Sequence, residues 1–417
     1  MSAAVSLTRL SAKQRRVMRW WCAEADARYD ALICDGAVRS GKTLCMTVSF
    51  FLWAMRSFDG RQLALCGKSV ESLRRNVLSE TLPVLRALGF VCVEKRTEKL
   101  LTVRFAGHEN RFLLFGGYDE SSAALIQGVT LAGVLFDEAA LMPRSFVEQG
   151  CARCSVEGSR LWFNCNPQGP GHWFYREWIE KAEEKRALRL HFTMDDNPSL
   201  SRRVRERYER AYSGVFYRRY ILGEWVAAEG RIYDFFDEQE YVRQPPEGPW
   251  TQWRVSVDYG TVNPTSMGLW GLCGGVWYRV KEAYYDSRVE GRQKTDEEYA
   301  AMLRELADGR ELARVIVDPS AASFIETLRR AGLRVKRADN SVSDGIRVTA
   351  ELLRQRKVVL CPACRDCLRE IAEYRWEDGS DRPRKENDHA MDELRYFAMD
   401  VRSGERGAAM SARCVRR

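Results

Sequence analysis

The feature that most constrains this chain is the octapeptide Gly-Ala-Val-Arg-Ser-Gly-Lys-Thr at residues 36–43. It has the complete G-x-x-x-x-G-K-T spacing of a phosphate-binding loop. A short apolar run at residues 31–34 precedes it, and a longer apolar-rich run at residues 44–55 follows it. We therefore predict a buried strand, the loop and a helix in that order, which is the context that a working loop of this type needs.

The residue types of the loop suit the phosphates of a nucleotide. Glycines let backbone N–H groups turn toward phosphate oxygens, and the N-terminus of the following helix adds its partial positive charge. We expect Lys42 to reach the β- and γ-phosphates of ATP and Thr43 to hold Mg²⁺ through its hydroxyl. The predicted ATP-binding residues of the loop are Gly36, Arg39, Ser40, Gly41, Lys42 and Thr43.

Length and composition indicate a globular protein with two domains. The chain has 417 residues, of which 45% are hydrophobic and 30% are charged, and one core rarely serves so many residues. No apolar run approaches the ~20 residues of a membrane span, and residues 1–10 are too polar for a signal peptide. The 13 scattered cysteines indicate reduced thiols in a cytosol. The net charge of +8 weakly favours binding to polyanionic partners.

Two further apolar runs end in polar side chains that can complete a nucleotide site. One run leads into Asp137 and Glu138, and the other leads into Asn164. We expect Asp137 to belong to the Mg²⁺ shell and Glu138 to orient and deprotonate the attacking water. Because the carboxyl ends of parallel strands line the ligand crevice, Asn164 and Asn166 are candidates for sensing the γ-phosphate.

These strand ends predict a doubly wound α/β NTPase domain over residues 1–228. Upstream of the loop, Gln14 could bind the adenine of the nucleotide or could be an ordinary exposed helix residue. Residues 191–225 are basic and are predicted to be helical, so we expect a closing subdomain from about residue 190. A stretch rich in proline and glycine marks a linker, placed at residues 229–250.

The remaining residues, 251–417, carry acidic side chains at positions that suit a metal centre. Two aspartates each follow a short apolar strand, and two more lie with a histidine within one turn of a predicted helix. The candidate ligands are Asp258, Asp318, Asp388, His389 and Asp392. Two divalent ions, Mg²⁺ or Mn²⁺, held mostly by oxygen ligands could stabilise the attacking and leaving oxygens of a phosphodiester cleavage. Taken singly, these aspartates could instead start turns or cap a helix, so the prediction rests on their joint order.

Three cysteines, Cys361, Cys364 and Cys367, have a spacing similar to that of zinc ligands. No local fourth ligand follows them, and the last two fall on an amphipathic helix pattern. We therefore assign no metal to them.

Taken together, the motifs resemble those of the large terminase subunit of tailed bacteriophages, the motor that packages DNA into proheads. The resemblance covers nearly the whole chain, preserves motif order, and is greatest to the branch typified by defective Bacillus prophages such as PBSX. The motifs that carry it are Ser-Ala-Lys-Gln at 11–14, the phosphate loop, Leu-Phe-Asp-Glu at 135–138, Asn-Cys-Asn-Pro at 164–167, Asp-Asn-Pro at 196–198, Gly-Glu-Trp at 223–225, Val-Asp-Tyr-Gly at 257–260, Val-Asp-Pro at 317–319 and Asp-His-Ala-Met-Asp at 388–392.

This resemblance implies an N-terminal P-loop ATPase of the ASCE type and a C-terminal nuclease domain of ribonuclease H-like fold. It implies that Gln14 lies beside the adenine and that Asn164 belongs to the motif that couples hydrolysis to movement. The implied metal-binding nuclease triad is Asp258, Asp318 and Asp392, with His389 beside it. The role of Arg39 stays open, since it could act in cis on the nucleotide or pair with Glu138.

The resemblance also implies partners and a place of action. We expect double-stranded DNA, a portal protein and a small terminase subunit as partners, a homo-oligomeric ring on the prohead, and no membrane. The implied location is the cytoplasm of the bacterial host rather than the mature virion. Two other hypotheses stay open, a helicase-like or repair ATPase fused to a nuclease, and a DNA- or capsid-docking protein without enzymatic activity.

Overall fold

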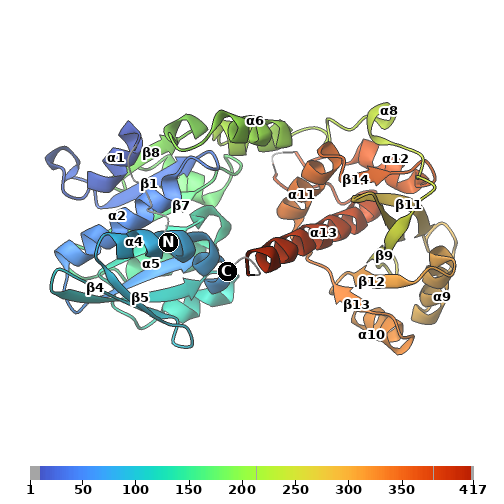
Figure 1. Cartoon of the computed structure of the whole chain (residues 1–417), viewed down its shortest axis with the longest axis horizontal. Coiled ribbons are helices and arrows are strands. Elements are labelled where there is room, and N and C mark those ends of the chain that lie inside the picture. Colours follow the sequence, from blue (N-terminus) through green and yellow to red (C-terminus); the bar gives the residue numbers. More distant parts are fainter. Residues whose placement is uncertain (1–9, 213, 379, 415–417) are drawn as a thin grey trace. The chain divides into compact units, whose positions relative to one another are not determined.

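The computed structural model describes residues 10–212, 214–378 and 380–414, so most of the stretch judged too polar for a signal peptide lies outside the described residues. The chain divides into two compact units, Met1–Ala227 and Ala228–Arg417, and each is described by itself (Figure 1). Among the described residues, no helix combines the length and the apolar character needed to cross a membrane.

The first unit is built on one eight-stranded sheet. Its strand order is β3-β4-β5-β2-β6-β7-β1-β8. The last six strands in this order, which are β5, β2, β6, β7, β1 and β8, run parallel to one another. The antiparallel strands β3 and β4 extend one edge. The strands are β1 Ala31–Gly36, β2 Gln62–Gly67, β3 Val91–Lys95, β4 Leu100–Phe105, β5 His108–Gly116, β6 Gly133–Asp137, β7 Arg160–Cys165 and β8 Ala187–Phe192.

Helices cover both faces of this sheet (Figure 1). Alternate residues of β1 belong to two cores, with Leu32 and Cys34 on the face of α2 and α4, and Ala31 and Ile33 on the face of α5. Burial on both faces explains the nearly continuous apolar strands and confirms the doubly wound α/β prediction. The helices are α1 Ala12–Arg19, α2 Lys42–Ser57, α3 Val70–Leu73, α4 Ser79–Ala87, α5 Arg144–Ala152, α6 Arg202–Ala211 and α7 Gly214–Tyr217.

Two predictions about the end of the first unit are wrong. Residues 191–225 are not continuously helical, because residues 191 and 192 end β8, which pairs in parallel with β1, and α6 and α7 cover only residues 202–211 and 214–217 of the rest. The segment 229–250 is not an open linker, because it packs into the second unit. Within it, Tyr233 is fully buried, and its ring stacks on Tyr374 with 5.9 Å between centroids.

The second unit is built on a mixed six-stranded sheet in the order β13-β12-β9-β10-β11-β14. The central strand β9 is antiparallel to β10 and parallel to β12, and the long helix α13 packs across all three. This is the ribonuclease H-like arrangement that the resemblance implies. The strands are β9 Trp250–Asp258, β10 Thr265–Cys273, β11 Val276–Tyr285, β12 Leu312–Val317, β13 Val335–Arg337 and β14 Val358–Leu360. The helices are α8 Glu238–Tyr241, α9 Asp296–Ala307, α10 Ala322–Arg330, α11 Val342–Arg354, α12 Arg365–Glu373 and α13 His389–Cys414.

Candidate nucleotide and metal sites

The phosphate loop joins β1 to α2, as its flanking sequence predicts. β1 ends at Gly36 and α2 begins at Lys42. Gly41 has a φ of +79°, and a Cβ atom added there would lie 2.5 Å from Nε2 of Gln14. Only glycine fits such a position without strain, so this residue lets α1 approach the loop closely.

Lys42 is held inside the loop by its ammonium group. Its Nζ donates to the backbone carbonyls of Gly36 at 3.2 Å and Ala37 at 2.9 Å, and to Oδ1 of Asn166 at 2.8 Å. Burial lowers the pKa of Lys42, since an apolar surrounding disfavours the charged form. The loop therefore presents a buried cation at the position predicted for a phosphate ligand, and Asn166 contacts it directly.

A chain of hydrogen bonds connects the predicted Mg²⁺ ligands. Nδ2 of Asn164 lies 2.9 Å from Oγ1 of Thr43 and 2.5 Å from Oδ1 of Asp137. The sheet order explains this, because β7 lies between β1 and β6. Burial and the charge of Glu138 raise the pKa of Asp137 to about 7, and Oδ1 of Asn164 is buried with no hydrogen-bond partner among the described residues. This oxygen-rich set fits a hard divalent cation such as Mg²⁺.

Glu138 takes an unusual backbone conformation directly after β6. Its φ and ψ are +61° and +45°, in the left-handed region, which costs a non-glycine residue roughly 1–2 kcal/mol. Such conformations persist where the surrounding structure holds them and are frequent at active sites. The geometry turns the chain sharply at the end of the strand, where the sequence predicts the general base.

Gln14 lies against the phosphate loop and is not an exposed helix residue. Only 3% of it is exposed, and its Nε2 donates to the carbonyl of Ser40 at 3.3 Å. Its Oε1 accepts from the backbone N–H of Ser11 at 3.0 Å, as part of a capping box. Oγ of Ser40 is buried without a partner among the described residues. Gln14 thus supports the loop, and its predicted contact with adenine stays a prediction.

Arg39 makes contacts that neither sequence hypothesis includes. Its Nε donates to the hydroxyl of Tyr208 at 2.8 Å, and its guanidinium lies 5.7 Å from the centre of the same ring. Its carbonyl accepts from Nδ2 of Asn197 at 2.7 Å, and its φ is +58°. The middle of the loop is therefore attached to residues from the basic segment that follows β8.

Asp35 is a residue that the sequence interpretation missed. It precedes Gly36 and is fully buried, yet Nε and Nη2 of Arg189 donate to it at 3.0 and 2.9 Å. Nδ1 of His191 lies 3.3 Å away, and Nε1 of Trp225 donates at 2.8 Å. A lone charge in the apolar strand before the loop is the signal that could have revealed it, because buried charges require partners.

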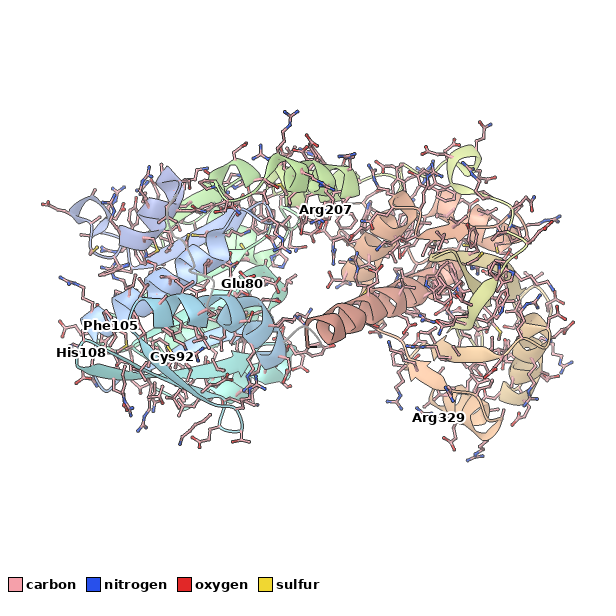
Figure 2. All side chains as sticks on the ribbon, in the orientation of Figure 1. Glu80, Cys92, Phe105, His108, Arg207 and Arg329 are labelled. Atoms are coloured by element: carbon pink, nitrogen blue, oxygen red, sulfur yellow. The ribbon has the colours of Figure 1, made fainter. Side chains whose placement is uncertain are left out.

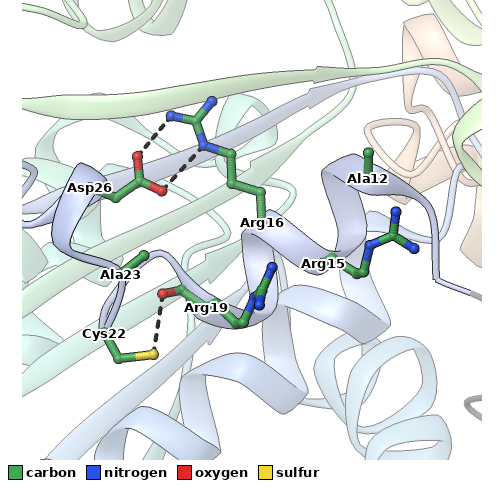
Figure 3. A pocket seen from close by; sticks show the side chains of 7 residues that line it. All are labelled: Ala12, Arg15, Arg16, Arg19, Cys22, Ala23 and Asp26. Atoms are coloured by element: carbon green, nitrogen blue, oxygen red, sulfur yellow. Dashed lines mark hydrogen bonds and ion pairs between the residues drawn. The ribbon is translucent and has the colours of Figure 1, made fainter.

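A separate cavity of about 630 Å³ lies against α1 (Figure 3). Arg15, Arg16 and Arg19 contribute to its lining, and Arg16 forms a paired contact with Asp26 at 2.7 and 3.2 Å. None of the predicted site residues lines it, so we assign it no role in the nucleotide site.

In the second unit, the structure brings two predicted strand-end aspartates together. The hydroxyl of Tyr396 lies 3.0 Å from Oδ2 of Asp318 and 3.4 Å from Oδ1 of Asp258. Nδ1 of His389 lies 3.0 Å from Oδ2 of Asp258. Burial raises the pKa of Asp258 to about 6, and the charges of Asp392 and Asp318 add to this rise. The charges of the other two predicted triad carboxylates therefore act on Asp258.

The other predicted ligands lie at the start of α13 and are paired with cations. Arg395 donates to Oδ1 of Asp392 at 2.5 and 3.2 Å. Nζ of Lys385 lies 3.1 Å from Oδ2 of Asp388 and 3.5 Å from Oδ2 of Asp392. In the part of the chain that the structure describes, no three acidic, histidine or cysteine side chains are placed to hold a metal ion as they stand. The donor set still fits Mg²⁺ or Mn²⁺ chemically. A bound cation would compensate the negative charges of the carboxylates that Arg395 and Lys385 compensate in this structure.

Comparisons with known proteins agree with the two-unit architecture. A family model described as terminase large subunit, T4likevirus-type, N-terminal, matches residues 33–240. The large terminase of a thermophilic bacteriophage is 50% identical, with a TM-score of 0.90 over 94% of this chain and 98% of that chain. The chain belongs to the bacteriophage large terminase family. A structure of the same thermophilic phage protein in complex with ADP matches with 49% identity and a TM-score of 0.88, again over 94% and 98% of the two chains.

A more distant member of the family is the terminase large subunit of Escherichia phage T5. It is 23% identical over 293 residues, which are 65% of this chain and 66% of that protein. That match therefore spans just under two thirds of the T5 protein. The family membership confirms the resemblance to large terminases drawn from the order of the motifs, and the likeness to the PBSX branch stays a prediction.

Proposed function

We propose that this chain is the ATP-driven motor and the endonuclease of a phage DNA-packaging machine. The observation that carries the ATPase part is the hydrogen-bonded chain from Thr43 through Asn164 to Asp137, with Lys42 buried beside it. Structures of the thermophilic phage terminase with ADP and with ATP-gamma-S support nucleotide binding at the same fold. Family membership favours packaging over a helicase-like or repair ATPase.

The residues of the first unit divide the ATPase work among them. Lys42 and the loop backbone bind the β- and γ-phosphates, and Thr43 and Asp137 hold the Mg²⁺ that neutralises developing phosphate charge. Glu138 orients the attacking water and accepts its proton. Asn164 contacts two of these residues, Thr43 and Asp137, and this supports the proposal that it reports the state of the γ-phosphate to the rest of β7.

The residues of the second unit supply the nuclease part. Asp258, Asp318 and Asp392 are the proposed ligands of two divalent ions, which when bound stabilise the attacking and leaving oxygens of a cleaved phosphodiester. His389 and Asp388 are proposed as further ligands or as groups that orient Asp258. The proposed partners are double-stranded DNA, a portal protein and a small terminase subunit, with a ring assembled on the prohead in the host cytoplasm.

Two substitutions test the division of labour between the units. Lys42→Ala should lower ATP turnover roughly 10²–10³-fold, by analogy with the loss of a preorganised donor, while Mn²⁺-dependent plasmid nicking continues. Asp258→Ala should abolish nicking and leave phosphate release unchanged. The controls are Lys95→Ala and Asp308→Ala, whose side chains are 57% and 60% exposed. Wild-type ATP turnover by Lys42→Ala would refute the assignment of the ATPase site. Wild-type plasmid cleavage by Asp258→Ala would refute the assignment of the nuclease site.

A further inference from the structure

The helix α6 is unusually basic and is attached to the phosphate loop. Its sequence holds five arginines and two glutamates, and none of its residues is buried. Arg203, Arg207 and Arg210 are exposed and recur at i, i+4 and i+7, so they share one face of the helix. Arg207 lies on this helix in Figure 2. We call these three residues the arginine stripe.

The remaining arginines of α6 lie outside the stripe and are paired with acidic side chains. Arg202 pairs with Glu206 at 2.9 Å, and Arg205 pairs with Asp195 at 2.5 Å. Within the stripe, Arg210 also reaches Glu206, at 3.7 Å, so the test below relies on the other two members. Arg202 lies about 100° around the helix from Arg203. The face of the stripe carries three positive charges and one carboxylate, that of Glu206, which lies three residues after Arg203 and contacts Arg210. Its net positive charge matches the regularly spaced negative charges of a nucleic-acid backbone.

The side of α6 next to the stripe contacts the loop. The ring of Tyr208 packs against the small apolar cluster that contains Ala37, and its hydroxyl accepts from Arg39. The guanidinium of Arg207 lies 5.8 Å from the centre of the same ring. One aromatic ring therefore touches both a stripe residue and a residue of the phosphate loop.

A second connection runs through the segment before α6. Asp195 binds Arg205 of the helix, and two residues later Asn197 donates to the carbonyl of Arg39 at 2.7 Å. A displacement of α6 would therefore act on both the side chain and the backbone of Arg39. Arg39 has a left-handed backbone conformation, with φ at +58°. Such a conformation persists only while the surrounding contacts hold it, so a change in these contacts can change the shape of the loop.

We propose that the arginine stripe binds the phosphate backbone of duplex DNA and that the contact between Tyr208 and Arg39 transmits DNA occupancy to the ATPase site. The inference rests on the proposed function, since it names the DNA surface of that motor. Binding through phosphates makes it independent of sequence. The same geometry gives α6 two tasks on two faces, holding DNA on one and adjusting the loop on the other.

The test uses the full chain, a mixed-sequence duplex of about 40 base pairs, long enough for several phosphate contacts, and ATPase rates measured with and without that duplex. Arg203→Ala/Arg207→Ala should weaken duplex binding and reduce the slope of log affinity against log salt by about 2, at roughly 0.9 per phosphate contact. The ratio of the two ATPase rates should fall toward unity. Arg202→Ala removes one charge from outside the stripe and should keep the wild-type slope and ratio.

Tyr208→Phe separates binding from transmission, because it keeps the ring and removes only the hydroxyl. It should bind DNA with the wild-type salt slope and lose the DNA-dependent increase in rate. The inference is overturned by any of three results: the double variant matches the wild type in slope and ratio, Arg202→Ala loses as much slope and ratio as the double variant, or the wild-type ATPase rate does not change when DNA is added. A wild-type chain without any ATP hydrolysis would instead refute the proposed function.

Discussion

Replacing Asp35 by asparagine is expected to destabilise the first unit. The carboxylate is fully buried, and Arg189, His191 and Trp225 all contact it at 2.8 to 3.3 Å. Asparagine has nearly the same shape but no charge, so the variant removes the electrostatic contribution while the packing stays the same. The strand that carries the phosphate loop would then lose the charged side-chain contact that adds to its backbone pairing with β8.

The size of the effect follows from the pKa of Asp35. Burial alone would raise this pKa, but hydrogen bonds from His191 and Arg189 lower it from 3.8 to about 2. That difference corresponds to roughly 2 kcal/mol, at about 1.4 kcal/mol for each pH unit. Because the partly buried Arg189 would also face a neutral partner, we expect a total loss of about 2–4 kcal/mol in the free energy of unfolding.

The same pKa sets the pH window in which Asp35 matters. A carboxyl whose pKa is lower in the folded chain stabilises it above the unfolded pKa and loses that contribution as pH falls. For Asp35 the loss runs from about pH 4 down to about pH 2. The asparagine variant should therefore differ most from the wild type at neutral pH, and the difference should shrink below pH 4.

Thermal denaturation of the full chain measures this prediction. At ~2–4 °C per kcal/mol for a unit of this size, the melting temperature of the first unit should fall by roughly 4–16 °C. The matched control is Asp30→Asn, which breaks a 2.7 Å contact with Arg186 at the start of the same strand pair, where both side chains are about 60% exposed. An exposed pair contributes about 1 kcal/mol at most. Equal melting temperatures for the two variants would refute the reasoning.

Three further predictions follow from individual contacts. Gly223→Ala should lower ATP affinity and stability, because its Cβ would lie 2.8 Å from the backbone nitrogen of Ala37 at a φ of +78°; wild-type nucleotide titration and melting curves would contradict this. Asn164→Ala should slow ATP turnover roughly 10- to 100-fold, as expected for an outer-shell partner of a metal site, and unchanged phosphate release would refute it. Glu393→Gln should cost the second unit about 3 kcal/mol, because the fully buried Arg279 loses one carboxylate partner and keeps Glu282; a urea midpoint within error of the wild type would exclude it.

The parts that the sequence predicts correctly depend on local patterns. The strand before the loop, the helix after it, and the strands ending at Asp137 and Asp258 each follow from a short run of apolar residues with polar residues at its end. Since parallel strands bring such ends to one edge of a sheet, the grouping of Asp137 with Asn164 was also predictable. What could not be predicted are partners that only the tertiary fold supplies. Tyr396, which bridges two carboxylates of the second unit, is one of these.

The error over residues 191–225 has a consequence for the loop itself. The predicted helical stretch begins at residue 191, inside β8, although Arg189 and His191 are the polar members of the strand-like alternation Ala-Leu-Arg-Leu-His-Phe at residues 187–192. Those two side chains are the partners of Asp35, more than 150 residues away in sequence, and Tyr208 from the same segment binds Arg39 across 169 residues. The segment that was assigned wrongly is therefore the one that supports the phosphate loop from outside. Arg189 and His191 of β8 explain why Asp35 can be buried as a charge, and Tyr208 of α6 and Asn197 before it are the partners of Arg39. A single helix assigned over residues 191–225 therefore concealed the contacts that connect the loop to the rest of the motor.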